Sequence, residues 1–378
     1  MELKDYRAKI DEIDAQIAHL FAERMQAAEA IADYKAQNHL PIYHPARERE
    51  VLLSASQAAA PYSREARVVF GAMMDVSRSR QAARLAGESP LTQAISRAVA
   101  ETPATFPQNA TVACQGIEGA YSHQAANRLF ALPQILFFQR FDGVFQAVEK
   151  GLCRYGVLPI ENSSAGSVTE VYDLMKGRDF SIVRGTRLHI VHALLTRGAK
   201  LGQIREVISH EQAVRQCAPF LKAHPEIRVT LCANTAVAAQ TVANSGRDDL
   251  AAIASPACAE LYGLTALPDS IQASDNNHTR FIVISKKPEI YPGANRISLM
   301  LTLPHVAGSL YRMIARFSAL EMNLLKIESR PIPGRDFEFM FYLDLEGSVY
   351  SKELLQSLAD MEHICESFRY LGSYPEVM

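Results

Sequence analysis

The sequence predicts a multidomain protein in which an all-α part, an α/β part and an α+β part follow one another. Three patterns predict this order: a helical apolar repeat in the first ninety residues, repeated strand-to-helix units from Ala110, and a final stretch ordered strand, helix, strand, strand, helix, strand. The expected domains span residues 1–90, 108–285 and 297–378. A chain of 378 residues is too long for one ordinary domain, which agrees with three parts.

Composition argues against several classes of protein. Apolar residues make up 48% of the chain and charged residues 21%, as in soluble globular proteins. A formal net charge of -2 gives no reason to expect a nucleic-acid partner. The charged start Met1–Asp5 has no apolar signal core and no run of about 18 apolar residues occurs, so we expect a cytoplasmic protein without a membrane span. The six cysteines have no metal-ligand spacing, so we expect reduced, mostly buried thiols.

A long amphipathic helix opens the chain, and cations interrupt its apolar stripe. Apolar residues recur at spacings of three and four, at Leu3, Tyr6, Ile10, Ile13, Ile17 and Leu20. Arg24 then stands where an apolar residue is expected, and Arg7 and Lys35 flank the stripe. Such cations either reach solvent, pair with Glu23 or Glu48, or bind an anionic ligand. Arg7 and Arg24 are 17 residues apart, about 25 Å along a helix, so both contact one small ligand only if a second copy contributes.

Two more helices complete the first part. The first helix should end near Asn38, Pro45 should open the second, and the third should run from about Ser63 to Leu85. Three helices with one cation-rich seam resemble the all-helical chorismate mutases. The resemblance places substrate-contacting groups at Arg7, Arg24, Lys35, Arg47, Glu48, Ser77 and Gln81. His44 occupies a position where some members of that family carry an aspartate near the substrate hydroxyl.

That resemblance implies catalysis by orientation. Chorismate is a dicarboxylate, and it rearranges to prephenate within one molecule while negative charge grows on its ether oxygen. Guanidinium groups can hold the two carboxylates in the reactive conformer. Lys35 and Gln81 can donate hydrogen bonds to the ether oxygen. This chemistry needs no nucleophile, no metal and no cofactor.

The middle of the chain predicts an α/β domain. Residues 86–110 contain Pro and Gly around a short helical pattern and are expected to form a linker. Four apolar runs then lead into polar loops and helices: Thr111–Cys114, Tyr155–Ile160, Glu206–Ile208 and Leu250–Ala254. A fifth run, Ile282–Ser285, should be a buried strand with the polar stretch Asn277–Phe281 just before it.

The polar loops predict a ligand-binding cleft. In α/β sheets, ligands bind beyond the carboxyl ends of strands, where helix N-termini offer free N–H groups. Ordinary helix capping accounts for part of the hydroxyls and amides in these loops. All of the loops together, with Asn277–Phe281, favour a cleft.

Three of these stretches, Gly119–His123, Pro159–Gly166 and Asn277–Phe281, together resemble prephenate dehydratase. The resemblance implies two subdomains, like those of a periplasmic solute-binding protein, that close over the substrate. Prephenate must lose its ring hydroxyl as water and its ring carboxylate as CO₂, which requires a proton donor and placement of two carboxylates. We expect Thr279 to contact the leaving hydroxyl and Arg280 to hold either a carboxylate or a neighbouring acid; the proton donor stays open. The other candidate cleft residues are Ser122, Glu161, Asn162, Ser163, Ser209, Gln216 and Phe281.

The last eighty residues follow a second expected linker at 286–293 and predict an α+β module. Strands are indicated by two alternations: Ile297, Leu299, Leu301 and Leu303, then Phe337, Phe339, Phe341, Leu343 and Leu345. Gly308-Ser309-Leu310 should start a helix, and Glu328-Ser329-Arg330-Pro331 should end a strand. Both motifs resemble the phenylalanine-sensing loops of the ACT domain, although Ser309 stands where that family usually has alanine. The alternative is a plain βαββαβ packing module.

Together these patterns indicate a bifunctional chorismate mutase and prephenate dehydratase that converts chorismate to phenylpyruvate under control by L-phenylalanine. We expect a homodimer or a higher homo-oligomer. Three alternatives stay open: an inactive, dimerising mutase-like domain, a dehydratase that acts on arogenate, and a solute-binding protein. The lack of an export signal and the intact set of mutase residues argue against the last.

Overall fold

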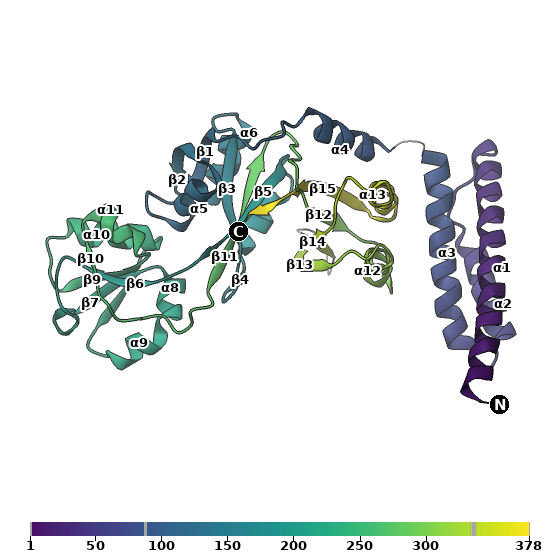
Figure 1. Ribbon diagram of the computed structural model, residues 1–378, viewed down its shortest axis with the longest axis horizontal. Coiled ribbons are helices and arrows are strands. Elements are labelled where there is room, and N and C mark those ends of the chain that lie inside the picture. The colour runs from purple at the N-terminus through teal and green to yellow at the C-terminus, as the bar shows by residue number, and fades with distance from the viewer. Residues whose placement is uncertain (1, 87–88, 333, 335–337, 378) are drawn as a thin grey trace. The chain divides into compact units, whose positions relative to one another are not determined.

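The computed structural model describes residues 2–86, 89–332, 334 and 338–377, and the chain divides into two compact units (Figure 1). The first unit comprises Met1–Ser96, Leu301–Asn323 and Tyr350–Phe368. The second comprises Arg97–Met300, Leu324–Val349 and Arg369–Met378. None of the described helices is both long and apolar enough to cross a membrane.

The N-terminal helices begin and end where the sequence predicts. They are α1 (Leu3–Gln37), α2 (Pro45–Ala58) and α3 (Ser63–Ala86). Asn38 caps the end of α1, and Pro45 occupies the first turn of α2, where its missing N–H costs nothing. His44 caps the start of α2, because its Nδ1 accepts the backbone N–H of Arg47 at 3.2 Å. The helical pattern inside the predicted linker is a further helix, α4 (Pro90–Glu101).

The apolar stripe of α1 is exposed in the single chain. Ile10 is 56% exposed, Ile17 57% and Leu20 60%, and the buried residues of α1 are Ala28 and Ala32 near its other end. A row of large apolar side chains in contact with water is typical of an interaction surface.

The α/β part contains two sheets, as the resemblance to a two-subdomain protein implies. The order in the first sheet is β16-β5-β11-β3-β1-β2, with β4 beside β3, and the order in the second is β10-β6-β9-β7-β8. The strands of the first are β1 (Asn109–Gln115), β2 (Leu132–Phe138), β3 (Tyr155–Asn162), β4 (Gly166–Ser167), β5 (Ser181–His189), β11 (His278–Ser285) and β16 (Glu376–Val377). Those of the second are β6 (Ala193–Thr196), β7 (Glu206–Ser209), β8 (Arg228–Leu231), β9 (Leu250–Ala254) and β10 (Thr265–Ala266).

Helices follow many of these strands. They are α5 (Tyr121–Leu129), α6 (Phe141–Glu149), α7 (Thr169–Met175), α8 (Glu211–Gln216), α9 (Ala218–Ala223), α10 (Thr235–Asn244) and α11 (Ala257–Tyr262), with a short 3₁₀ turn at Leu201–Gln203. Several predicted strand-to-helix units are present, among them β1–α5 and β3–α7, and in Figure 1 the two sheets occupy separate lobes joined by crossing strands. The six cysteines are all free, and four of them are buried.

Strand β11 begins earlier than the sequence predicts. The polar residues expected just ahead of it lie within it: Thr279 pairs with Asn162 of β3 and with Leu188 of β5. Because side chains alternate along a strand, Phe281 and Val283 enter one hydrophobic cluster while Ile282 and Ile284 enter another. The same alternation separates Thr279 from its neighbour in sequence, Arg280.

The C-terminal part has the predicted order of strand, helix, strand, strand, helix, strand. Its elements are β12 (Arg296–Thr302), α12 (Ser309–Ala319), β13 (Leu324–Pro331), β14 (Phe339–Glu346), α13 (Lys352–Ile364) and β15 (Ser367–Tyr374). The order in the sheet is β13-β14-β12-β15. Phe337 of the predicted alternation lies outside the described residues.

One face of this C-terminal sheet shares a core with the dehydratase-like lobe. Met300, Tyr342, Leu371 and Tyr374 join the cluster built around Phe145, and they are all buried. The consecutive residues Tyr342, Leu343, Asp344 and Leu345 of β14 are therefore buried on both faces of the strand. After β15, the chain returns through β16, which pairs in parallel with β5.

Candidate functional site

The three-helix part brings four of the predicted mutase residues together. Nη1 of Arg24 donates to Oγ of Ser77 at 2.5 Å, and Nζ of Lys35 donates to Oε1 of Gln81 at 3.3 Å. Ser77 and Gln81 are buried on α3, facing two cations of α1. This group, Arg24, Lys35, Ser77 and Gln81, is called the mutase half-site below.

The ammonium of Lys35 is partly withdrawn from water. Its Nζ also donates to the backbone oxygen of Ile42 at 2.6 Å. Burial lowers the pKa of Lys35 below its ordinary value, and the nearby carboxylate of Glu48 opposes this by favouring the charged form. Glu48 itself is paired with Arg78.

The other predicted mutase residues do not join the half-site within one chain. Arg47 is exposed and pairs with Glu50 at 3.1 Å, and His44 serves as a helix cap. Arg7 lies four to five turns before Arg24 on the same straight helix. Glu23, offered as a partner for the cations, contacts His19 at 3.3 Å instead.

A cleft of about 370 Å³ lies where the two α/β lobes meet. Five of the residues predicted for a dehydratase site line it: Ser122, Asn162, Gln216, Thr279 and Phe281. A neighbouring hollow of about 690 Å³ extends it past Ser164, Gln212 and Ser274. A cleft of this combined size accommodates a substrate of about a dozen heavy atoms or more.

A continuous chain of amide groups supports the threonine in this cleft. Nδ2 of Asn162 donates to Oγ1 of Thr279 at 2.9 Å and to Oδ1 of Asn277 at 2.8 Å. Nδ2 of Asn277 donates in turn to Oε1 of Gln216 at 3.0 Å. Asn162, Asn277 and Thr279 are at least nine-tenths buried, so these bonds form largely out of water.

The electropositive groups of the cleft belong to the backbone. Ser122 lies in the first turn of α5, and Asn234 caps α10, with its Oδ1 accepting the N–H of Val237 at 2.8 Å. No lysine or arginine is among the described residues that line the 370 Å³ cleft. Burial lowers the pKa of His192 and that of His210, which line it, so both are neutral near pH 7. Helix N-termini are then the groups that can receive anions in the 370 Å³ cleft, while Arg215 lines the neighbouring hollow.

Four predicted cleft residues lie elsewhere. Glu161, Ser163 and Arg280 line a separate cavity of about 210 Å³. Glu161 and Arg280 are neighbours in sequence of the cleft-facing Asn162 and Thr279 on β3 and β11, where successive side chains alternate, and Ser163 follows the end of β3. Ser209 is fully buried, and its hydroxyl donates to the backbone oxygen of Ile253 at 2.6 Å.

Arg280 contacts acids rather than the cleft. Its guanidinium is paired with Asp344 of β14 and, at 2.8 Å, with Glu376 of β16. Of the two roles expected for Arg280, the structure supports the contact with a neighbouring acid. Its partners lie 64 and 96 positions further along the chain, which no local pattern indicates.

The structure adds residues that sequence reasoning missed. Asn277 was recognised only as the start of a polar stretch, and Tyr121, His192, His210 and Asn234 were not selected as site residues. The position of Asn234 before a helix is an N-cap signal that identifies the loop. His192 follows β5 without any local motif.

The predicted effector motifs have two different surroundings. On β13, Glu328 accepts a hydrogen bond from Ser167 at 2.6 Å, and Arg330 donates to Asp173 at 3.1 Å. Lys326 of the same strand contacts Glu161 at 2.8 Å. Strand β13 is thus tied to β3, β4 and α7 of the α/β part.

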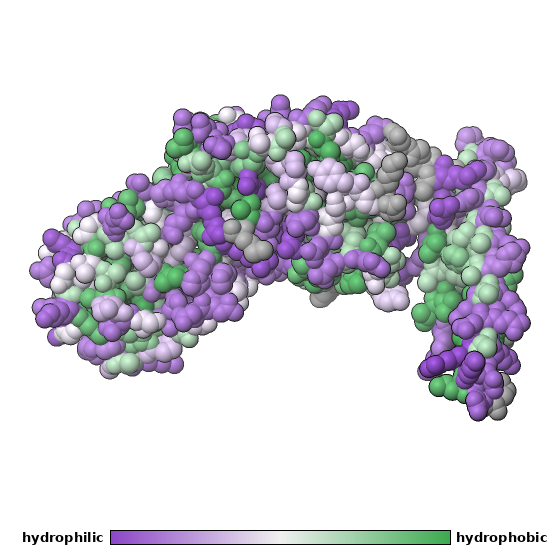
Figure 2. All heavy atoms as spheres, in the orientation of Figure 1, coloured by the Kyte–Doolittle hydropathy of each residue, from purple (hydrophilic) through white to green (hydrophobic). Residues whose placement is uncertain are grey.

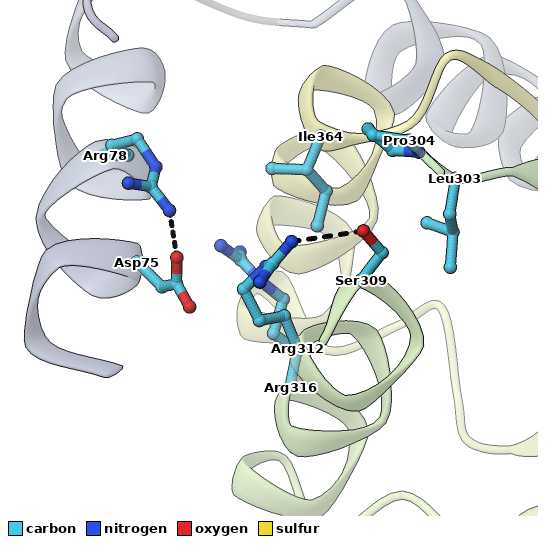
Figure 3. A pocket seen from close by; sticks show the side chains of 8 residues that line it. All are labelled: Asp75, Arg78, Leu303, Pro304, Ser309, Arg312, Arg316 and Ile364. Carbon is cyan, nitrogen blue, oxygen red and sulfur yellow. Dashed lines mark hydrogen bonds and ion pairs between the residues drawn. The ribbon is translucent and has the colours of Figure 1, made fainter. Parts of the chain in front are cut away.

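The second motif begins α12. Gly308 has φ +83°, and a side chain added there would lie 3.1 Å from Arg312. Figure 3 shows Ser309 accepting a hydrogen bond from Arg312 at 3.1 Å in a small pocket that also has Arg316, Asp75 and Arg78 on its walls. Its volume is about 50 Å³, enough for water or a small ion but too small for an amino acid.

Comparison with known proteins gives a family match for each of the two parts that carry these sites. A prephenate dehydratase family model matches residues 112–289, and a chorismate mutase type II model matches residues 6–82. A bifunctional chorismate mutase/prephenate dehydratase of Enterobacter agglomerans is 32% identical over 98% of this chain and 95% of its own length. An arogenate dehydratase/prephenate dehydratase of Arabidopsis thaliana is 37% identical over 70% of this chain and 72% of its own length.

The solved structures contain the same fold. A prephenate dehydratase from Arthrobacter aurescens in complex with L-Phe has a TM-score of 0.64 and 27% identity, covering 70% of this chain and 89% of that one. The match to the Enterobacter agglomerans protein extends over nearly all of both chains, and each of its two enzyme domains has its own family match here. The chain therefore belongs to the family of bifunctional chorismate mutase/prephenate dehydratases.

Proposed function

We propose that the two sites act in sequence in phenylalanine synthesis and that L-phenylalanine, the later product, controls them. The N-terminal site rearranges chorismate to prephenate, and the cleft converts prephenate to phenylpyruvate. The observation that carries the dehydratase half is the amide-supported hydroxyl of Thr279 in a cleft ringed by helix N-termini.

In the mutase site, the cations orient a substrate that reacts with itself. One C–O bond of chorismate breaks and one C–C bond forms, without proton transfer. Arg24 holds a carboxylate, Lys35 and Gln81 donate to the ether oxygen, and Arg7 arrives from a second copy of the chain. Arg47, Glu48, Ser77 and His44 complete the contacts expected from the family resemblance.

The exposed stripe of α1 supports the second copy. Residues from Leu3 to Leu20 present large apolar side chains to water, and Arg7 lies among them. Pairing two such helices covers the stripe and carries each Arg7 toward the partner's half-site.

In the dehydratase cleft, prephenate and one proton yield phenylpyruvate, water and CO₂. The ring C–O bond breaks as the hydroxyl leaves with the proton, and the electron pair of the breaking C–carboxylate bond completes the aromatic ring. Thr279 donates a hydrogen bond to the leaving oxygen, while Asn162 supports Oγ1 as negative charge develops there. Ser122, Gln216 and Phe281 contact the substrate from the walls.

The lack of lysine and arginine among the described residues that line the 370 Å³ cleft suits a decarboxylation, since Arg215 lines only the neighbouring hollow. A guanidinium beside the departing carboxylate would stabilise the charged ground state more than the transition state, in which charge leaves the carboxylate. Helix N-termini at Ser122 and Asn234 bind carboxylates more weakly and without a full charge.

Feedback control rests on the C-terminal module, for which we propose the ACT identity. Gly308, Ser309 and Leu310 offer a glycine turn and a helix start, and Glu328, Ser329, Arg330 and Pro331 lie at the end of β13. The relative from Arthrobacter aurescens binds L-Phe, which favours this effector. The pocket at Ser309 is too small for an amino acid in one chain, so the effector site requires a second module.

The contacts of β13 offer a route from effector to cleft. Glu328 holds Ser167 of β4, and Lys326 holds Glu161, which directly precedes Asn162 of the amide chain. A shift of β13 on effector binding would therefore move the strand end that supports Thr279.

Product analysis tests this assignment. Purified protein is incubated with chorismate, and prephenate, phenylpyruvate and CO₂ are followed by NMR and mass spectrometry. Sequential appearance of prephenate and phenylpyruvate supports both activities. Prephenate without phenylpyruvate would show that the protein has mutase activity only. A parallel incubation with arogenate decides between the two substrates: faster release of phenylalanine than of phenylpyruvate would contradict the prephenate assignment.

A further inference from the structure

The amide chain beneath Thr279 has one direction, which is set at Asn162. Its Oδ1 accepts the backbone N–H groups of Ser164 at 3.0 Å and Ala165 at 2.9 Å. A backbone N–H can only donate, so this atom must be the oxygen, and the Nδ2 on the other side must be a donor.

This direction passes through three further residues. Nδ2 of Asn162 requires an acceptor on Asn277, which turns the Nδ2 of Asn277 toward Gln216. The Gln216 atom that receives it is therefore Oε1, and this oxygen also lies 2.8 Å from Nε2 of His192. An oxygen receives hydrogen only, so His192 must carry its hydrogen on Nε2.

The other end of the chain determines the hydrogen of Thr279. Oγ1 of Thr279 accepts from Asn162, so its own O–H points to a different acceptor, and Thr279 lines the cleft. A reversed chain would require the hydroxyl to donate to the amide and would leave no hydrogen for the leaving group.

We propose that His192 is a positioning residue of the dehydratase site, a neutral imidazole whose Nε2–H anchors Gln216 and thereby keeps the amide chain directed toward Thr279. This inference rests on the dehydratase function of the cleft. His192 acts through Gln216 and transfers no proton.

The surroundings of His192 support the neutral form. The side chain is 95% buried, and its Nδ1 has no hydrogen-bond partner among the described residues. A hydrogen on Nδ1 would therefore be buried and unpaired. Burial of the ring also lowers the pKa of His192, which favours the neutral imidazole. The titratable groups that line the cavity beside it are Tyr121, Glu170 and His210.

Two substitutions of similar polarity separate this role from others. In His192→Gln, the amide nitrogen reaches the place of Nε2 and can donate to Gln216. In His192→Asn, the shorter amide reaches only the place of Nδ1. We expect His192→Asn to lose about tenfold or more in dehydratase kcat with little change in KM, the scale of one well-placed hydrogen bond. His192→Gln should recover most of this loss with an unchanged pH profile.

Three results would overturn the proposal. Equal activity of His192→Asn and wild type would show that the anchor has no role. Equal loss in both variants, with a limb of the pH profile removed, would show that His192 itself transfers a proton. Additive losses when His192→Asn is combined with Gln216→Ala would show that it does not act through Gln216. His224→Gln, at the end of α9 and outside the residues that line the cleft, controls for removal of a histidine. A wild-type protein without dehydratase activity would refute the proposed function and not this contact.

Discussion

Arg280 of β11 and Asp344 of β14 form an ion pair in which the side chain of Asp344 is fully buried and that of Arg280 is 9% exposed. Asp344 also accepts from Ser298, and Arg280 donates to the hydroxyl of Tyr374 at 2.9 Å. The strand that presents Thr279 to the cleft is thus held from behind by the C-terminal sheet.

Removing Arg280 should lower the free energy of unfolding of the protein rather than weaken substrate binding. Arg280→Ala leaves the buried carboxylate of Asp344 without its cation, although Glu376 keeps Arg187 and Arg296, and this should cost about 3–5 kcal/mol in urea unfolding. The double variant Arg280→Met with Asp344→Asn should recover part of that loss. A stable Arg280→Ala protein with a raised KM for prephenate would instead place Arg280 on a substrate carboxylate.

Thr279 should affect one activity only. Thr279→Val keeps the shape but removes the hydroxyl, and dehydratase kcat should fall roughly 10²-fold or more. Prephenate should accumulate from chorismate because the mutase half-site is untouched. Thr279→Ser, which keeps the hydroxyl, is the matched control and should stay close to wild type. Parallel loss of mutase turnover in a folded Thr279→Val protein would contradict two separate sites.

The mutase site should be restored by mixing two inactive proteins. Arg7→Ala and Lys35→Ala, once their subunits exchange, give mixed dimers with one intact and one doubly defective site. Half of the dimers are mixed, so about a quarter of wild-type activity should return. Arg24→Ala mixed with Lys35→Ala is the control: both residues lie in one half-site, so no intact site can form. Absence of recovery in the first mixture, with exchange demonstrated, would rule out a shared site.

The pH dependence of the mutase reaction should reflect Lys35. Burial lowers its pKa below 10.5, and only the protonated form carries the charge that stabilises the ether oxygen. Activity should therefore be complete below the lowered pKa and fall as the pH rises through it. Glu48→Gln removes the opposing attraction and should move this alkaline limb to still lower pH. Lys9→Arg on the same helix should leave the alkaline limb in place. An alkaline limb that does not move in Glu48→Gln would show that a group other than Lys35 titrates there.

The response to phenylalanine should depend on the turn before α12. In Gly308→Ala, a residue at φ +83° acquires a side chain 3.1 Å from Arg312, so the loop must shift. We expect calorimetric binding of L-phenylalanine to weaken at least several-fold while dehydratase activity without effector is kept. Gly293→Ala has a similar φ of +82° but open space around its new side chain, and it should respond like wild type. No heat and no thermal stabilisation of the wild-type protein at millimolar phenylalanine would contradict the sensor role.

Local patterns identified the main helices and strands, because periodicity, Pro45 and Gly308 act over one or two turns of chain. They also located the stretches that contribute to the cleft. They did not show which side chains of a stretch face it: Glu161 and Asn162 are adjacent, yet only Asn162 supports Thr279. Strand pairing between distant segments decides which side chains face the cleft. His192 becomes part of the site only through its hydrogen bond to Gln216, 24 positions further along the chain.

Strand β16 has a consequence for the way the protein is made. It emerges from the ribosome after the whole C-terminal sheet, yet it pairs with β5, and Tyr374 just before it completes the core around Phe145. The dehydratase lobe therefore cannot finish its fold during synthesis of its own segment, and the edge of β5 stays open until β16 has been synthesised. A nonsense mutation between codons 297 and 374, which removes both Tyr374 and β16, should accordingly yield an aggregating protein, not an enzyme freed from feedback.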